Sequence, residues 1–150
     1  MPEPEAALKF AALRYLARRE YSRAELAKKL ALKFGGNEHG DALIEAVLDR
    51  FQASNMLSDR RYANVRAQSR GRRLGNARLK HELAQQGVSA EEIDKAVAQA
   101  GDETERCRTV WQKKFSRLPA SSVERARQMR FLQYRGFSAD AVRAVLAGAR

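Results

Sequence analysis

The sequence predicts an all-α protein of three tandem three-helix modules that form an elongated, curved helical-repeat array. Strand signals are nearly absent, because no alternating Val/Ile/Thr run and no Asn-Gly or Asp-Gly turn occurs. Apolar residues instead recur at spacings of three and four, which is typical of helices packed on one side. This pattern repeats along the chain with a period near 50 residues, which is typical of an array of similar units.

The first unit begins with a helix expected over residues 3–19. Its expected inward face carries Ala6, Phe10, Leu13 and Ala17, which share one side at the helical period.

The second helix is expected to start at Ser22, because Ser22 and Glu25 have the capping-box spacing. Leu26, Leu30 and Phe34 follow at spacings of four, and Gly35 can end this helix. Residues 35–40 predict a flexible loop, after which Asp41 can cap a third helix. The expected inward residues of that helix are Leu43, Ile44, Val47, Leu48 and Phe51.

The second unit repeats this organisation. Ser58 or Asp59 starts a helix, Gly75-Asn76 separates it from the next, and Ser89-Ala90-Glu91-Glu92 forms another capping box before the third. Gly87 ends the middle helix, and Gly101 ends the unit. The expected inward residues are Tyr62, Val65, Ser69, Leu79, Leu83, Ile93 and Val97.

The third unit begins at Asp102 and is interrupted at Pro119, which cannot continue a helix. Ser121 or Ser122 starts its second helix, and Gly136-Phe137-Ser138 leads into its third. The expected inward residues are Cys107, Val110, Trp111, Phe115, Ala126, Met129, Leu132, Val142, Val145 and Leu146.

An internal repeat supports this division. The segment from Leu83 to Val97 matches the segment from Leu132 to Leu146 at an offset of 49 residues, and the same offset pairs Tyr62 with Trp111. Leu26 and Leu30 lie over Leu79 and Leu83 at an offset of 53. We therefore expect modules at residues 1–57, 58–101 and 102–150, each leaning mainly on its neighbours.

Charge is unevenly distributed along the chain. The net charge is +11, with +6 in residues 59–83, −4 in residues 84–103 and +7 in residues 104–135. An acidic island of Glu91, Glu92, Asp94, Asp102 and Glu103 thus separates two basic blocks, although charge runs are also common on solvated helix faces. The excess of positive charge favours a polyanionic partner, most often nucleic acid.

The candidate contacts to DNA or to a nucleoprotein lie in these two blocks. Arg66, Arg70 and Arg73 have helical spacing and are expected to form one row that follows phosphates. Nothing marks a recognition helix for base readout. Tyr62 and Trp111 are expected in the core, whereas Tyr134 is expected to be more open. The complete set of candidates is Arg60, Arg61, Arg66, Arg70, Arg72, Arg73, Arg78, Lys80, Lys113, Lys114, Arg117, Arg127 and Arg130.

Signals for an enzyme are weak. His39 and His81 lack metal-ligand spacing, so neither a metal nor another cofactor is expected. Cys107 is expected to be a small buried residue, although a nucleophile completed by a distant histidine is an alternative. A single cysteine, no apolar run long enough to span a membrane and an acidic N-terminus favour a reducing cytoplasm.

Three segments resemble the RecX family of regulatory proteins. The central one runs from Met56 to Ala63 and continues through Leu74–Leu83 to Gly87-Val88-Ser89. The segments Ala12–Leu26 and Phe131–Ser138 are similar to the first and last modules of that family.

The resemblance implies a bacterial protein that binds the groove of the RecA–DNA filament. Members inhibit filament growth, ATP hydrolysis, strand exchange and the coprotease activity behind the SOS response, and many bind DNA directly. Such a chain is expected to act as a monomer on RecA and on single- or double-stranded DNA without sequence preference. The alternative is a sequence-nonspecific DNA- or RNA-binding protein with no recombinase target.

Overall fold

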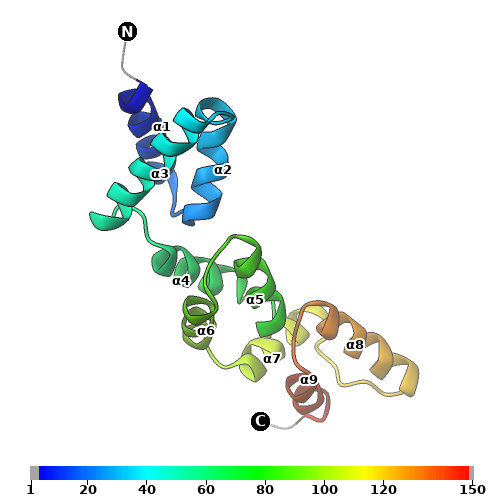
Figure 1. The fold of residues 1–150 in the computed structure, drawn as a ribbon. Coiled ribbons are helices and arrows are strands. Elements are labelled where there is room, and N and C mark those ends of the chain that lie inside the picture. Colours follow the sequence, from blue (N-terminus) through cyan, green and yellow to red (C-terminus); the bar gives the residue numbers. More distant parts are fainter. Residues whose placement is uncertain (1–3, 149–150) are drawn as a thin grey trace.

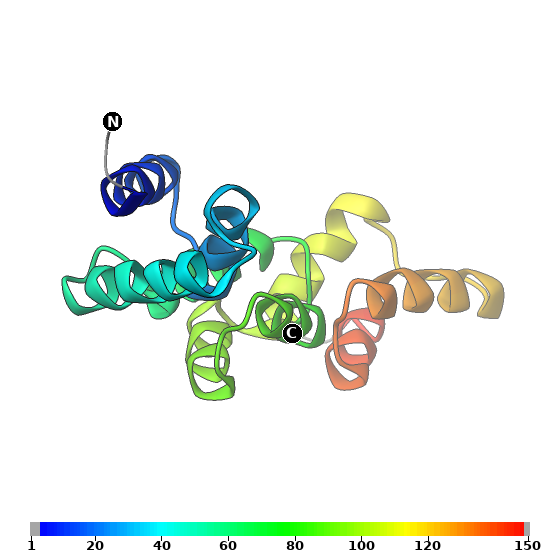
Figure 2. The ribbon, with the colours of Figure 1, turned by 45° about the horizontal axis from the view of Figure 1, so that its top comes forward.

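The computed structural model describes residues 4–148, and every regular element in that range is an α-helix. The helices form three groups of three that follow one another from the N-terminal to the C-terminal end of an elongated molecule (Figures 1 and 2). Each group has its own cluster of buried apolar residues. The predicted all-α array of three-helix modules is confirmed.

The first module consists of α1 (Pro4–Arg18), α2 (Arg23–Phe34) and α3 (Glu38–Ala53). The predicted inward faces of α2 and α3 are confirmed, since Leu26, Leu30, Ile44, Val47, Leu48 and Phe51 are all buried.

The predicted inward face of α1 is wrong. Leu8 and Ala12 are buried instead, whereas Phe10 is 64% exposed and Leu13 is 40% exposed. The helix has apolar residues on two sides, and the side with Leu8, Tyr15 and Leu16 is the one that packs into the core. The larger combined area of these side chains favours that orientation. Residue 3, where this helix was expected to begin, lies outside the described residues.

The turn between α2 and α3 is shorter than predicted. Asn37, not Asp41, caps α3, because the Asn37 side chain accepts a hydrogen bond from the Gly40 amide at 2.8 Å. Asp41 lies inside the first turn, where its carboxylate accepts from the Gly36 amide at 3.3 Å.

The second module consists of α4 (Asp59–Arg70), α5 (Asn76–Gln85) and α6 (Ala90–Gln99). Ser58 caps α4, and Leu79, Leu83, Ile93 and Val97 are buried as predicted. The inward face of α4 differs from the prediction, because Val65 and Ser69 are exposed and Ala63 and Ala67 pack beside Tyr62. Alanines allow α4 to lie close to α6, which bulkier residues would prevent.

The third module consists of α7 (Glu103–Lys114), α8 (Ser122–Tyr134) and α9 (Ala139–Leu146). Its core contains Cys107, Val110, Leu132, Val142, Val145 and Leu146, as predicted. Phe115 contacts Phe131 edge-on, with ring centroids 5.5 Å apart.

The internal repeat has a structural counterpart. The turn from α5 to α6 and the turn from α8 to α9 each use a glycine with positive φ, which is 80° at Gly87 and 90° at Gly136. Ser89 and Ser138 then cap the following helices through their side-chain oxygens.

The second and third modules meet through backbone atoms. The Gly75 amide donates to the Arg135 carbonyl at 2.8 Å, and the Ala77 amide donates to the Gly136 carbonyl at 3.2 Å. A Cβ atom added to Gly75 would lie 2.3 Å from backbone atoms of Gly136. This close approach therefore requires glycine at position 75.

Two charged side chains complete this second junction. The Arg106 guanidinium donates to the Leu74 carbonyl at 2.7 Å, to the Gly71 carbonyl at 3.2 Å and to the side-chain oxygen of Asn76. Burial lowers the pKa of Arg106. Glu103 accepts from the Asn76 amide at 2.8 Å and from the Ser138 amide at 3.3 Å.

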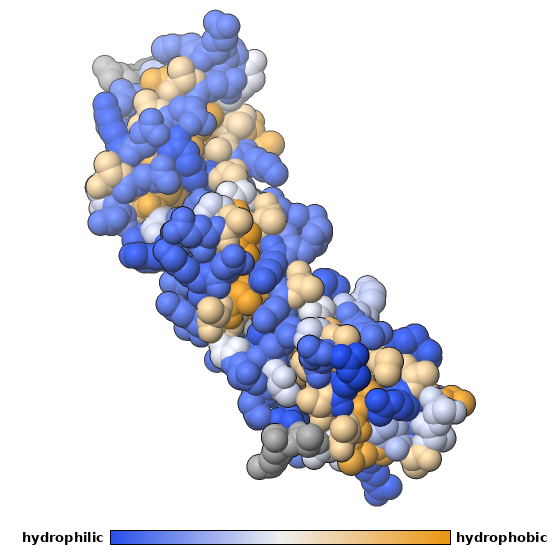
Figure 3. All heavy atoms as spheres, turned by 60° about the horizontal axis from the view of Figure 1, so that its bottom comes forward, coloured by the Kyte–Doolittle hydropathy of each residue, from blue (hydrophilic) through white to orange (hydrophobic). Residues whose placement is uncertain are grey.

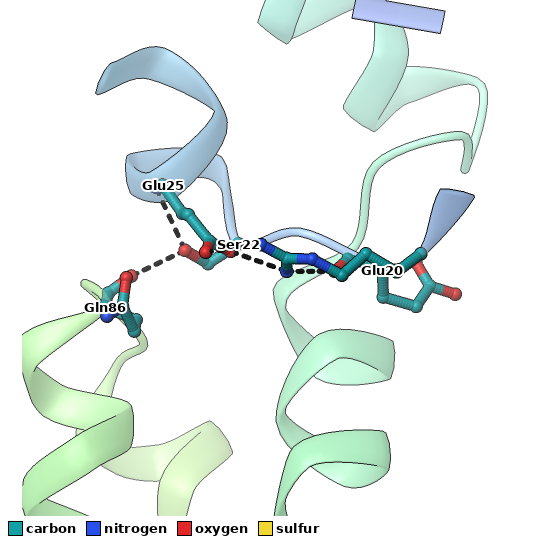
Figure 4. A network of polar contacts seen from close by, with 5 residues as sticks. Glu20, Ser22, Glu25 and Gln86 are labelled. Carbon is teal, nitrogen blue, oxygen red and sulfur yellow. Dashed lines mark hydrogen bonds and ion pairs between the residues drawn. The ribbon is translucent and has the colours of Figure 1, made fainter. Parts of the chain in front are cut away.

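The first and second modules meet mainly through side chains. Ser22 accepts a hydrogen bond from the Glu25 amide at 3.1 Å and donates to the Gln86 carbonyl at 2.7 Å (Figure 4). Asp59 accepts from the Arg23 amide at 2.7 Å, and Arg61 pairs with Glu20 at 2.9 Å. The first junction thus combines hydrogen bonds with an ion pair, whereas the second consists of hydrogen bonds and, within residues 4–148, is the one that joins backbone to backbone.

Candidate nucleic-acid interface

A cleft with only basic charge lies between the second and third modules. It has a volume of about 500 Å³ and is lined by Arg72 and Arg73 from the turn after α4 and by Lys113, Lys114 and Arg135 from α7 and the end of α8. We call the cleft that these five cations line the basic cleft. Val110 and Phe131 form its apolar part, and no acidic residue lines it.

The Phe131 ring positions two of the cations in the basic cleft. Lys114 Nζ lies 5.3 Å from the ring centroid, and the Arg135 guanidinium carbon lies 4.9 Å from it. Arg135 also donates to the Arg73 carbonyl at 3.4 Å, which links the two sides of the cleft.

A second hollow of about 580 Å³ adjoins the basic cleft and shares Arg72 and Lys113 with it. It is lined by α4, α6 and α7 residues, including Gln68, Gln99 and Thr109, and again by no acid. The two hollows form a continuous basic and polar surface along the junction. Hydrophilic side chains cover most of the face in Figure 3, with apolar patches over all three modules.

The structure brings together four of the predicted contact residues, namely Arg72, Arg73, Lys113 and Lys114. They come from both basic blocks, which are separated along the chain by the acidic island. The sequence reasoning missed Arg135 and the junction residue Arg106. The available signal for Arg135 was its place at the end of the second basic block, residues 104–135.

Other predicted residues are engaged within the chain. Arg61 pairs with Glu20 at 2.9 Å, and Lys80 lies 3.7 Å from Asp94. Arg78 donates to the Tyr134 carbonyl at 3.1 Å and lies against the Tyr134 ring.

Arg70 is held most firmly of this group. Its guanidinium donates twice to the Glu82 carboxylate, at 2.9 and 3.3 Å. These hydrogen bonds lower the pKa of Glu82 and raise that of Arg70. Two N–H groups of Arg70 therefore bind Glu82 and are not available to a phosphate.

The predicted row of Arg66, Arg70 and Arg73 on one helix face is wrong. Helix α4 ends at Arg70, so Arg73 follows it in a turn and faces the basic cleft instead. Gly71 follows the last residue of α4, at a point where a Cβ atom would lie 2.5 Å from the Ala67 carbonyl oxygen.

The remaining predicted residues lie elsewhere on the surface. Arg60, Arg66 and Arg130 are exposed and make no ion pair with the described part of the chain. Arg117 and Arg127 line a smaller hollow of about 300 Å³ in the third module, together with the acidic Glu124.

The acidic island is largely used within the protein. Asp102 caps α7, Glu103 accepts two amides at the second junction, and Asp94 and Glu91 lie near Lys80 and Lys95. Most of these acids therefore bind groups within the protein, and none of them lines the basic cleft.

The candidate chemistry of Cys107 and the aromatic residues is also decided by burial. Cys107 is fully buried as predicted, and burial raises its pKa to about 12, which keeps the thiol protonated and unreactive. Tyr62 is buried, and Trp111 donates to Gln128 at 2.8 Å beside the core. Tyr134 is 77% exposed, as expected. No cluster of metal-ligating side chains occurs within residues 4–148.

No helix between residues 4 and 148 is long and apolar enough to cross a membrane. The fold and the basic cleft define a class of protein: a tandem array of three-helix units with a basic surface at a junction between them.

Within this class, the chain belongs to the RecX family of regulatory proteins. Models of the first, second and third three-helix domains of RecX match residues 9–51, 58–97 and 101–146. The regulatory protein RecX of Leptothrix cholodnii is 47% identical over 144 residues, which cover 95% of this chain and 89% of that protein. The regulatory protein RecX of Chromobacterium violaceum is 45% identical over 141 residues, which cover 94% of this chain and 90% of that protein.

The structure is also similar to solved RecX structures. It superimposes on the crystal structure of RecX from Lactobacillus salivarius with a TM-score of 0.79, covering 97% of this chain and 96% of that one. At 19% identity this likeness shows the fold alone.

Proposed function

We propose that this chain regulates the RecA recombinase by binding along the groove of the RecA–DNA filament. The observation that carries the proposal is the basic cleft, in which five cations from two modules converge without an acid. Such a cleft concentrates positive potential where a phosphate backbone would lie. Membership of the RecX family supports the regulatory role.

The proposed consequence of binding is inhibition. An elongated array lying in the groove would wedge between adjacent recombinase subunits, which must move during ATP turnover. Filament growth, ATP hydrolysis and strand exchange would then all slow, and DNA repair, recombination and the SOS response would be modulated. A monomer is sufficient for this action, because the three modules already provide an extended surface.

Within this proposal the predicted contact residues have unequal weight. Arg72, Arg73, Lys113 and Lys114 form the centre, together with Arg135. The exposed Arg60, Arg66, Arg117, Arg127 and Arg130 extend the positive surface, whereas Arg61, Arg70, Arg78 and Lys80 contribute through their contacts inside the chain. We further propose a cytoplasmic location, module boundaries after residues 57 and 101, and no enzymatic activity.

The alternative function is sequence-nonspecific binding of DNA or RNA without a recombinase target. The same cleft favours it, because phosphate contacts alone carry no sequence information. The two functions differ in whether the recombinase adds affinity beyond that of bare nucleic acid.

The test is single-strand-dependent ATP hydrolysis by the cognate recombinase, titrated with this chain while DNA is in excess. Excess DNA absorbs any effect of competition for strands. Inhibition at substoichiometric protein is the expected result. Inhibition that disappears as DNA is added would reject the regulator and favour the nonspecific binder.

Charge reversal of two cations tests whether the basic cleft is responsible for inhibition of the recombinase. Arg72→Glu combined with Lys113→Glu is expected to abolish most of the inhibition and to flatten the salt dependence of DNA binding, because fewer counterions are released. Lys28→Glu combined with Lys29→Glu is the matched control, since these exposed lysines of α2 line neither hollow at the junction. Equal losses in both variants would mean that net charge, rather than the basic cleft, governs binding.

A further inference from the structure

We infer that the outer face of α1 is a docking surface for an acidic protein segment with an apolar side. We call it the α1 face and define it by Phe10, Leu13, Arg14, Arg18 and Lys33. It lies in the first module, apart from the basic cleft. The inference deepens the proposed function in one respect only, since it takes the recombinase as the source of that segment.

The apolar part of the α1 face has no partner within the described chain. Phe10 and Leu13 are 64% and 40% exposed, and Ala6 and Ala17 on the same side of the helix are exposed too. Figure 2 shows α1 at the outer edge of the molecule, with α2 and α3 on its other side. An amphipathic helix ordinarily buries one apolar side, and a second apolar side that stays exposed marks an interaction surface.

Basic residues border this apolar strip. Arg14, Arg18 and Lys33 line a cleft of about 280 Å³ between α1 and α2, together with Ala11 and Tyr15 and with no acid. Arg14 lies 5.9 Å from the Phe10 ring centroid, so charge and apolar surface are contiguous.

Three acids in and near α1 are paired with residues outside the α1 face. Glu5 pairs with Arg50 of α3 at 3.0 Å, Glu20 pairs with Arg61, and Glu25 pairs with Arg19. The net charge of +1 over residues 1–58 therefore conceals a local excess of positive charge on the α1 face.

The exposed apolar strip and the bordering cations together indicate which partner fits the α1 face. A carboxylate-bearing segment complements the three cations, while its apolar side covers Phe10 and Leu13. A second copy of this chain is disfavoured, because it would bring another +11 charge against a basic face. Phosphate backbone would leave the apolar strip exposed, and the Tyr15 ring is already held edge-on against Tyr21 at 5.7 Å, which limits its use for base stacking.

The test compares two binding measurements on the full chain. A Phe10→Ser, Leu13→Ser variant is titrated against cognate recombinase filaments on single-stranded DNA and against the same DNA alone. We expect filament affinity to fall about tenfold or more, as for central interface residues, while affinity for bare DNA stays within about twofold. Leu118→Ser combined with Val123→Ser is the matched control, because both residues are exposed apolar side chains of the third module.

Each other outcome overturns the inference in a distinct way. Unchanged filament affinity would remove the α1 face from the interface but leave the proposed function intact, provided that Arg72→Glu with Lys113→Glu still weakens binding. Equal losses on filament and bare DNA would identify nucleic acid as the occupant. Self-association that the variant abolishes would identify a second copy.

A further measurement decides the inference if the native chain binds filaments no better than bare DNA, which would refute the proposed function. Backbone amide chemical shifts of the full chain are then followed by NMR during titration with a helical peptide. This peptide carries Leu along one side of its helix and Glu along the edges of that side. Shifts confined to α1 and the end of α2 would support the docking surface. Their absence would refute it.

Discussion

The two junctions of this molecule are built in different ways. The second and third modules are joined by backbone hydrogen bonds from Gly75 and Ala77, and by the half-buried Arg106 that donates to two carbonyls. The first and second modules are joined by side chains, chiefly Ser22, Asp59 and Arg61. Backbone contacts admit little adjustment, whereas side-chain contacts can re-form at a slightly different angle. We therefore expect the last two modules to move as one body, with the first attached more adaptably.

This difference matters for the basic cleft and the α1 face. The basic cleft is made from both modules of the rigid pair, so its cations keep a fixed spacing. The α1 face lies on the more adaptable module, where small changes of angle would help it to reach a partner.

The largest expected effect comes from adding one methyl group to the rigid junction. Gly75→Ala would place a Cβ atom 2.3 Å from backbone atoms of Gly136, so the two modules must separate. We expect a loss of about 3 kcal/mol in the free energy of unfolding, at the upper end for overpacking, measured by urea denaturation. Ala98→Ser, at an exposed position of α6, is the control.

The modules that lose stability in Gly75→Ala show whether the two junctions differ. Hydrogen exchange at Leu26 and Leu30 of the first module should be unchanged in Gly75→Ala, while exchange at Leu132 should accelerate. Equal acceleration in all three modules would mean that the chain unfolds as one unit and that the two junctions do not differ.

Removing the Arg106 guanidinium should have the next largest effect. Arg106→Met keeps much of the side-chain volume but leaves the Gly71 and Leu74 carbonyls without this donor. We expect a loss of about 2 kcal/mol in the free energy of unfolding, together with a drop in affinity for DNA as the basic cleft loosens. Arg66→Met, at an exposed residue of α4, should change unfolding by less than about 0.5 kcal/mol.

A smaller effect is expected at the adaptable junction. Ser22→Ala removes both the cap of α2 and the hydrogen bond to the Gln86 carbonyl, and should cost about 1–2 kcal/mol. Ser121→Ala removes a cap of the same length, 3.1 Å, from an exposed serine that makes no bond between modules. The difference between the two variants in thermal denaturation measures the bond across the junction. A Ser121→Ala loss as large as that of Ser22→Ala would show that this bond contributes nothing.

The smallest effect concerns an ion pair inside one module. The Arg70 hydrogen bonds lower the pKa of Glu82 below its ordinary value of 4.5 in the folded state. The resulting stabilisation is present above that value and is lost as the pH falls through the folded-state pKa. Glu82→Gln should therefore be less stable than the native chain by under about 1 kcal/mol at pH 7. The difference should shrink as the pH falls below 4.5 and through the lower pKa of folded Glu82. A difference independent of pH would contradict this assignment.

The fold was largely predictable because its signals are local. Capping serines, glycines with positive φ and apolar spacing identified the helices, and the repeat identified the modules. The inward face of α1 was predicted wrongly, because Phe10 and Leu13 also form an apolar row at helical spacing, on the opposite side from Leu8 and Ala12. Only packing against α2 and α3 decides between them.

The candidate site was predictable in composition but not in arrangement. The basic blocks identified Arg72, Arg73, Lys113 and Lys114, since charge is visible in the sequence. The pairing of Arg70 with Glu82 and the end of α4 at that residue depend on tertiary contacts and on a turn. The net charge of the first module gave no sign of the α1 face, because a net charge does not show on which side of a helix the charged residues lie.

The glycine contact at the second junction also has a mechanical consequence. If opposite ends of the molecule were pulled apart along a lengthening polymer, load would pass in series through both junctions. The Gly75–Gly136 contact and its paired backbone bonds would resist shear together, whereas the bonds of Ser22, Asp59 and Arg61 would be loaded one after another. We therefore expect the first module to separate from the other two under load before those two separate from each other.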